Sequence, residues 1–298
     1  MSDDDRFRLF HLPFSFMLPQ RVASERGYFA DEGLDADLVE RERSDVEWKY
    51  IPAEERLTDD YGVDVYPVCK WESLKRTWEM DDGRVVAKGT FADQPYSVFT
   101  RRDDVEEPAD LAGLPVGINE RTGQEYTAMR ALEEHVAPED VELVHHGMPT
   151  DRLRALYDGD VDAVTLLEPH STLAERLGFE RVLTFENHMG IVGDDDLDRE
   201  TFAAFMRAYG RAVGEINAHP DRYREEYLSM LRAEESLAPD LFAEVDLDAV
   251  REELTVPEYS VPQLATGEEL DEHLRWMQRR ELVDDAADIS GIVADGGD

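Results

Sequence analysis

Apolar runs of strand length alternate with helical patterns along the first two thirds of the chain, and this order constrains the fold most. Such alternation is typical of an α/β protein with a mainly parallel sheet. The expected strands cover residues 6–14, 34–40, 63–68, 83–91, 94–101, 114–119, 141–147, 161–167 and 181–185. The expected helices cover residues 18–33, about 53–59, 71–80, 123–135, 149–159 and 171–178, and from about residue 198 the chain is mainly helical.

Two strand–helix units of the sequence resemble each other. "GVDVYPVCKWESL" and "DVDAVTLLEPHSTL" each run from a polar turn through a Val-Asp start and a short apolar strand to a polar group at the strand end. Either the chain contains two related halves, or the likeness is one that any two such units share. Two halves predict two lobes, and a length of 298 residues suits them. Ligands of open parallel sheets collect outside the carboxyl ends of the strands, so we expect an interlobe ligand cleft.

The chain is strongly acidic, with 31 Lys plus Arg against 70 Asp plus Glu and a formal net charge of −39. Its hydrophobic fraction of 42% and its periodic segments nevertheless indicate a folded protein. The lysines are confined to four positions, Lys49, Lys70, Lys75 and Lys88. An acidic, lysine-poor composition is typical of a halophilic protein, whose carboxylate repulsion is screened by salt. The charge argues against nucleic acid and anionic membranes as partners.

The sequence also bears on location and metal content. No segment approaches the ~20 apolar residues of a membrane span, and "MSDDDRFRLF" lacks the features of a signal peptide. We therefore expect a cytoplasmic protein without membrane insertion, or an extracytoplasmic one if the start codon is misassigned. A single cysteine excludes an internal disulfide and a zinc site of several thiolates. His145, His146 and His188 match no metal-binding spacing, so no metal and no cofactor are expected.

Polar and aromatic residues that follow two strands of the first half are candidate ligand contacts. Ser15 and Phe16 follow the first expected strand, where Phe16 is either a cleft wall or a core residue. Cys69, Lys70 and Glu72 follow strand 63–68. A lysine kept at a strand end in a lysine-poor chain is expected to contact an anionic ligand group. The alternative is that Cys69 is a small buried hydrophobe and that Lys70 pairs with Glu72.

Candidate contacts in the second half also stand at strand ends. Four of them precede or open the expected helix 123–135, namely Asn119, Thr122, Gly123 and Gln124. Free backbone N–H groups at a helix start attract anions, although an ordinary helix cap has the same pattern. Glu168 and His170 follow strand 161–167 and could receive a ligand amine or exchange a proton with it. Alternatively, Glu168 interacts with the positive end of the next helix.

Several segments resemble, in order, a known superfamily. They are "ASERGYFADEGLDADLV", "HHGMPTDRLRALYDGDVDAVTLLEPHSTLAERLG" and "GEELDEHLRWMQRRELVDD". They are similar to type 2 periplasmic-binding proteins, specifically the branch of nitrate, sulfonate and taurine binders and thiamine-pyrimidine synthases (NMT1/THI5-like). The resemblance implies two α/β lobes that close on a small molecule by hinge bending, with a helical C-terminal segment. The implied lobes are residues 1–95 with 190–298, and residues 96–189.

The resemblance implies two alternative functions. One is binding of a small anionic or zwitterionic organic solute, as in the substrate-binding component of an ABC importer, with an ABC permease as partner. The other is a cytoplasmic enzyme on the same scaffold, either like the thiamine-pyrimidine synthases or another small-molecule lyase or decarboxylase. The synthases have a cysteine-rich segment, a cofactor-binding lysine and a sacrificial histidine. Here these positions hold residues 184–196 without cysteine, Val68 and Glu72, so binding is favoured over catalysis.

Removal of salt provides a test of the halophile interpretation. We expect the melting temperature to fall between molar KCl and dilute buffer, because the surface carboxylates then repel one another without screening. Thermal melts followed by circular dichroism would measure the change. A melting temperature that is the same in both buffers would contradict the interpretation.

Overall fold

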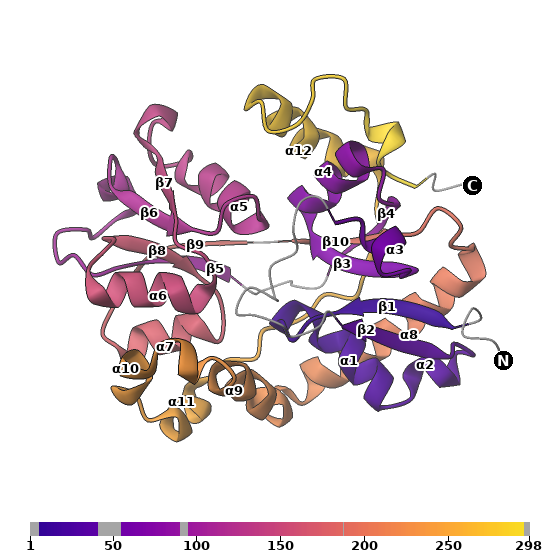
Figure 1. Cartoon of the computed structure of the whole chain (residues 1–298), viewed down its shortest axis with the longest axis horizontal. Coiled ribbons are helices and arrows are strands. Elements are labelled where there is room, and N and C mark those ends of the chain that lie inside the picture. The colour runs from indigo at the N-terminus through magenta and orange to yellow at the C-terminus, as the bar shows by residue number, and fades with distance from the viewer. Residues whose placement is uncertain (1–5, 41–54, 90–94, 187, 295–298) are drawn as a thin grey trace. The chain divides into compact units, whose positions relative to one another are not determined.

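The computed structural model describes residues 6–40, 55–89, 95–186 and 188–294. The chain divides into two compact units, each built on its own sheet (Figure 1). Unit 1 comprises residues 1–92, 188–218 and 259–298, and unit 2 comprises residues 93–187 and 219–258. The ends of three expected elements, at residues 53–54, 90–91 and 94, lie outside the described ranges. Within those ranges, no helix has the length and apolar character needed to cross a membrane.

Unit 1 contains a six-stranded sheet in the order β11-β4-β10-β3-β1-β2. Its strands are β1 (Phe7–His11), β2 (Ala36–Glu40), β3 (Val65–Cys69), β4 (Arg84–Gly89), β10 (Met189–Gly193) and β11 (Gln263–Leu264). The pairs β1–β2 and β1–β3 are parallel, whereas β10 is antiparallel to both β3 and β4. The prediction of an α/β fold is confirmed, but β10 and β11 were not expected from the sequence. Strand β11 has only two residues, and β10 contains two glycines, Gly190 and Gly193, which are uncommon in strands.

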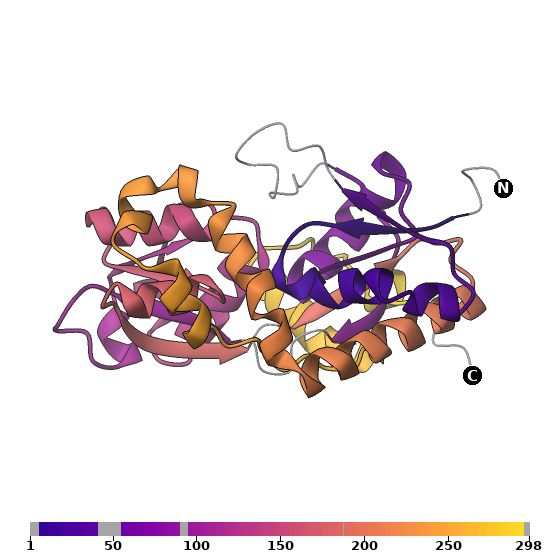
Figure 2. The same ribbon diagram turned by 90° about the horizontal axis from the view of Figure 1, so that it is seen from below.

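The helices of unit 1 cover this sheet. They are η2 (Ser15–Met17), α1 (Leu18–Glu25), α2 (Tyr28–Asp31), α3 (Leu57–Asp60), α4 (Lys70–Met80), α8 (Arg199–Ala218), α12 (Gly267–Arg279) and η7 (Ile289–Gly291). The single helix expected over 18–33 is divided in two, because Gly27 has a left-handed φ of 73°. Figure 2 shows α8 running beside α1 and α2. Phe205 of α8 packs its ring against those of Phe7 and Phe29, which fixes these helices to the sheet.

Unit 2 contains a five-stranded sheet in the order β7-β6-β8-β5-β9. Its strands are β5 (Pro95–Thr100), β6 (Pro115–Ile118), β7 (Glu142–His145), β8 (Ala163–Leu166) and β9 (Glu180–Glu186). Strand β6 is parallel to β7 and β8, and β5 is antiparallel to β8 and β9. The helices are η3 (Pro108–Leu111), α5 (Gly123–Leu132), η4 (Pro138–Asp140), α6 (Pro149–Asp158), α7 (His170–Arg176), η5 (Pro220–Tyr223), α9 (Arg224–Arg232), η6 (Glu235–Leu237), α10 (Pro239–Ala243) and α11 (Leu247–Glu253).

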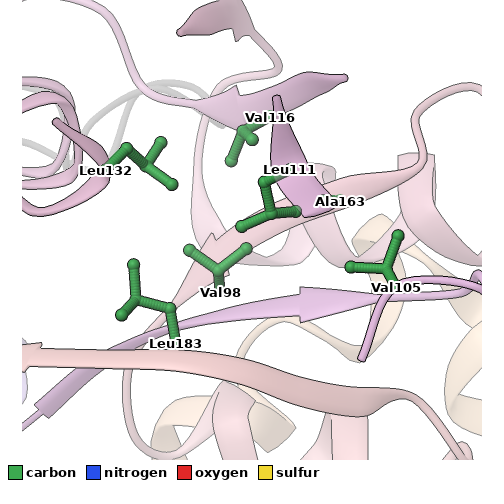
Figure 3. Packing of buried hydrophobic residues seen from close by; sticks show 7 residues of the cluster. All are labelled: Val98, Val105, Leu111, Val116, Leu132, Ala163 and Leu183. Carbon is green, nitrogen blue, oxygen red and sulfur yellow. The ribbon is translucent and has the colours of Figure 1, made fainter. Parts of the chain in front are cut away.

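One hydrophobic cluster joins α5 to the sheet of unit 2 (Figure 3). Leu132 of α5 packs with strand residues and loop residues, namely Val98, Val105, Leu111, Val116, Ala163 and Leu183. Full burial of an aliphatic side chain of this size stabilises a fold by roughly 1.5–3 kcal/mol. The cluster therefore anchors α5, whose N-terminus follows the carboxyl end of β6.

A buried arginine holds together two strand ends of unit 2. Arg152, in the first turns of α6, is fully buried. Its Nε donates to the Thr165 carbonyl at 2.8 Å, and its Nη1 donates to the Gly147 carbonyl at 2.5 Å. Burial lowers the pKa of Arg152 to about 10, so the guanidinium stays charged at neutral pH. The side chain thus bridges β8 and the loop after β7 with a buried positive charge.

Residues 219–258 belong to unit 2, which differs from the division expected from the sequence. That division placed all of residues 190–298 in lobe one. In the structure, α11 packs against α7, and Arg176 forms an ion pair with Glu253 at 2.5 Å. A buried network adds to these contacts: the Thr150 hydroxyl donates to Glu234, and His170 Nε2 lies 3.0 Å from the same Glu234 oxygen. Helical periodicity shows that a segment is amphipathic but not which sheet it covers.

Removal of the Glu234 carboxylate is predicted to destabilise unit 2. Glu234→Ala leaves the buried Thr150 hydroxyl and His170 without this partner, at a cost of about 2–3 kcal/mol. Urea unfolding would show the change as a lower midpoint. Glu235→Ala is the matched control, because the neighbouring Glu235 side chain is exposed. Equal midpoints for both variants would show that the network contributes little stability.

Candidate functional site

A cavity of about 330 Å³ lies within unit 1, at the sheet edge where β3 and β4 end and β10 begins. Its basic side chains come from four separate segments, as Lys70, Lys88, His188 and His273. Val85, Met189 and Leu270 supply apolar surface, and Ser73 and Ser260 supply hydroxyl groups. The cavity therefore combines cationic, hydroxyl and aliphatic groups, as sites for small organic molecules commonly do.

The basic lining contrasts with the composition of the chain. Two of the four lysines, Lys70 and Lys88, line this one cavity, although the formal net charge is −39. Among the described lining residues, Glu269 is the one carboxylate. Charges act more strongly in a partly enclosed site than in open water, because the surrounding dielectric is lower. The cavity is thus suited to an anionic group.

Lys70 is oriented by His273 of α12. The Lys70 Nζ lies 2.9 Å from His273 Nε2, and His273 Nδ1 lies 3.1 Å from the Glu269 carbonyl oxygen. An ammonium group can only donate and a carbonyl can only accept, so His273 carries its proton on Nδ1 and is neutral. Trp71 and Trp276, with ring centroids 5.0 Å apart, hold α4 against α12. The lysine is therefore placed by contacts with a helix far away in the sequence.

Glu72, which the alternative interpretation pairs with Lys70, forms an ion pair with Arg76. Its carboxylate lies 3.4 Å from the Nε of Arg76, one turn later on α4. Both side chains of this pair are almost fully buried. Glu72 is accordingly directed to the interior of unit 1, and it does not line the cavity.

Lys88 forms an ion pair with Glu269. The Lys88 ammonium donates to one carboxylate oxygen, and the Thr266 hydroxyl donates to the other at 3.0 Å. The hydrogen bond from Lys88 holds the pKa of the Glu269 carboxyl below its usual value. The two side chains remain 32% and 46% exposed, so this pair lies at the open side of the cavity.

Cys69 ends β3 and caps α4, with its Sγ 3.4 Å from the Glu72 N–H. Burial, followed by the nearby Glu72 charge, raises the pKa of the Cys69 thiol to about 12. The thiol is therefore protonated at neutral pH and is a poor nucleophile.

The remaining candidates of unit 1 are engaged in packing. Ser15 is buried, and its carbonyl accepts a hydrogen bond of 2.5 Å from the Tyr259 hydroxyl. Phe16 stacks on Phe14, with ring centroids 5.1 Å apart. Of the five residues singled out in unit 1, the structure brings only Lys70 to the cavity.

In unit 2, one group of candidates forms the turn between β6 and α5. The Thr122 hydroxyl donates to the Asn119 carbonyl at 2.6 Å and accepts from the Gln124 N–H at 3.3 Å. Thr122 is thus the cap residue of α5, and Gly123 is the first residue of that helix. The side chain of Asn119 is buried and lies 3.8 Å from the Met148 sulfur. The turn presents the start of α5 at the carboxyl end of β6.

Glu168 and His170 follow β8, the strand next to β6 in the sheet. The Glu168 carboxylate accepts hydrogen bonds from the Thr172 hydroxyl at 2.8 Å and the Thr172 N–H at 3.3 Å. Burial raises the pKa of Glu168. His170 Nε2 lies within 3.1 Å of both the Thr150 hydroxyl and Glu234. These contacts direct the His170 ring into the interior of unit 2.

The sequence analysis missed Lys88, Glu269 and His273. The rarity of lysine was a signal that could have identified Lys88, which lies in the second half of the expected strand 83–91. Glu269 and His273 lie on one face of α12 at i and i+4, but the sequence does not show what that face covers. In the described part of the chain, no group of three His, Cys, Asp or Glu side chains is arranged to hold a metal ion.

Comparison with known proteins supports the fold. The periplasmic aliphatic sulphonate binding protein SsuA from Escherichia coli has a TM-score of 0.70 at 12% identity, over 97% of this chain and 92% of that one. The alkanesulfonate-binding protein SsuA from Xanthomonas axonopodis bound to MOPS gives 0.68 at 12% identity, over 99% of each chain. The desulfurization enzyme DSZB gives 0.60 at 17% identity, over 97% and 96%. No curated protein sequence matches significantly.

At identities this low, structural likeness shows the fold alone, and these neighbours include both binding proteins and an enzyme. The family match is made on the sequence itself. The family described as NMT1/THI5 like matches residues 17–223, which is more than half of the chain and extends over segments of both units. The resemblance stated from the sequence is confirmed: the chain belongs to the NMT1/THI5-like family.

Proposed function

We propose that this protein reversibly binds a small anionic or zwitterionic organic solute, as the substrate-binding component of an ABC importer does. The observation that carries the proposal is the cavity of unit 1, where two of the four lysines gather in a chain of net charge −39. Sulfonate-binding proteins share the fold, which supports the same class of ligand.

The cavity has the parts that such a ligand requires. Lys70 donates charge-assisted hydrogen bonds to an anionic head group, and His273 keeps its ammonium in position. The aliphatic part of the ligand packs on Val85, Met189 and Leu270. A volume of about 330 Å³ is at the lower end of the range for small-molecule sites, so the ligand is expected to be small.

An enzyme on this scaffold has less support from the site. The only cysteine of the sequence is Cys69, and its buried thiol is protonated at neutral pH. A thiolate nucleophile at this position would require the opposite environment, with exposure and nearby positive charge. The binding role requires only that Lys70 remains an ammonium.

The importer role further implies a permease and a location outside the cytoplasm. We propose both as consequences of the binding function. Cell fractionation, with antibody detection of this protein in each fraction, distinguishes an importer component outside the cytoplasm from a cytoplasmic binding protein. Co-purification with a membrane permease would support the transport role, and exclusive recovery in the cytoplasm would contradict it.

The test begins with the ligand. Protein purified in molar salt is denatured, and the small molecules released are identified by mass spectrometry. Calorimetry with the identified molecule then compares wild type with Lys70→Ala. We expect the variant to lose about 1.5–3 kcal/mol of binding free energy, as for a hydrogen bond to a charged group.

Lys75→Ala is the control for this measurement. Lys75 lies on the same helix, but its ammonium donates to the Leu282 carbonyl at 2.7 Å and does not line the cavity. Its affinity should match that of wild type. Equal affinities for wild type and Lys70→Ala would show that the ligand does not bind through Lys70 in this cavity.

A further inference from the structure

We infer that Asn217 is a positioning residue of the proposed ligand site. Its side chain does not line the cavity of unit 1, but it fixes Tyr259, the residue from which one wall of that cavity begins. The wall is formed by Ser260, Val261 and Gln263, all within four residues of Tyr259. The inference rests on the proposed function and adds a residue that acts on the ligand through this wall.

Asn217 and Tyr259 stand where the chain leaves unit 1 and where it returns. Asn217 is in the last turn of α8, which ends at Ala218, and the chain then belongs to unit 2 for residues 219–258. Tyr259 is the first residue of unit 1 after that passage. The wall of the cavity therefore begins directly after the return of the chain, and its position depends on how Tyr259 is held.

The Asn217 amide group holds Tyr259 through both of its backbone groups. The Asn217 Nδ2 donates to the Tyr259 carbonyl at 2.8 Å, and the Asn217 Oδ1 accepts from the Tyr259 N–H at 2.9 Å. An amide supplies a donor and an acceptor, so it matches both groups. Tyr259 is 1% exposed, and its hydroxyl donates to the carbonyl of Ser15, the first residue of η2. The backbone of Tyr259 is thus fixed to α8 and its hydroxyl to η2.

The wall that follows Tyr259 lies close to the end of β4. A Cβ added to Gly89, the last residue of β4, would lie only 3.0 Å from the Pro262 Cα. Gln263 of β11 lies opposite Lys88 in the antiparallel pair with β4. A displacement of Tyr259 would therefore change the position of the wall relative to Lys88, which lines the same cavity.

The segment that contains the wall contributes much of the cavity lining. Six of the lining residues lie between residues 260 and 273, in the wall and in α12. The packing of Trp71 on Trp276 holds the α12 end of this segment against α4. The hydrogen bonds of Asn217 act at the other end. Their loss is therefore expected to loosen residues 259–263 and to leave α12 in place.

Hydrogen–deuterium exchange tests the positioning without any ligand. Asn217→Ala removes both hydrogen bonds to the Tyr259 backbone, so peptides covering residues 259–265 should exchange about fivefold faster than in wild type. Peptides from α12 should exchange at the wild-type rate. Unchanged exchange of residues 259–265 would overturn the inference, whatever the ligand is.

Calorimetry with butanesulfonate as the probe measures the effect on the site. Asn217→Ala is expected to bind it about fivefold to tenfold more weakly than wild type, because the wall is no longer fixed before binding. Asn217→Asp should also lose affinity, since a carboxylate cannot donate to the Tyr259 carbonyl. The measurements are made in molar salt, at a temperature at which circular dichroism shows every variant to be folded. A residue that only stabilised the fold would leave these affinities unchanged.

Tyr28→Phe is the matched control. The Tyr28 hydroxyl donates to Glu215, which lies on α8 two residues before Asn217, so this variant loses a hydrogen bond to the same helix but none to Tyr259. Its affinity for butanesulfonate should equal that of wild type. If Asn217→Ala also binds as wild type does, the inference fails and the proposed function stands. If wild type does not bind butanesulfonate, the proposed function fails and the inference fails with it.

Discussion

The pairing of β10 between β3 and β4 is the interaction on which the cavity of unit 1 depends. It returns the chain to the first sheet after unit 2 and places Met189 opposite both Cys69 and Gly89. Gly190 is required there, because a Cβ at this position would lie 2.5 Å from the Ser73 hydroxyl oxygen on α4. The close approach of α4 to β10 in turn sets Lys70 and Ser73 at the edge where β4 ends with Lys88 and Gly89.

The site follows from this framework through contacts that cross long stretches of sequence. Lys70 and His273 are 203 residues apart, and Lys88 and Glu269 are 181 residues apart. In both cases a lysine near the end of β3 or β4 contacts a residue of α12. Trp71 and Trp276 pack together and hold α12 against α4. Packing between α4 and α12 thus fixes the positions of these side chains more precisely than a loop could.

The sequence predicted the order of elements well, because hydrophobic period and turn residues are local properties. The rarity of lysine and the position of Lys70 after a strand singled this residue out, and the structure places it in the lining of the cavity. The sequence could not predict that His170 turns inward to Glu234, since that contact depends on the placement of residues 219–258 in unit 2. The same limit applies to Glu269 and His273, whose contacts with the two lysines form only when α12 packs against α4.

The buried guanidinium of Arg152 interacts electrostatically with the carboxylates on the surface of the protein. Excess carboxylates create a negative potential that reaches inward, and a cation inside the unit is stabilised by that potential while the carboxylates are destabilised by one another. Dissolved ions weaken both effects, but they screen exposed charges more than buried ones. Arg152 therefore acts as a fixed positive counterion to the surface carboxylates. Unlike dissolved cations, it remains in place when the salt concentration falls.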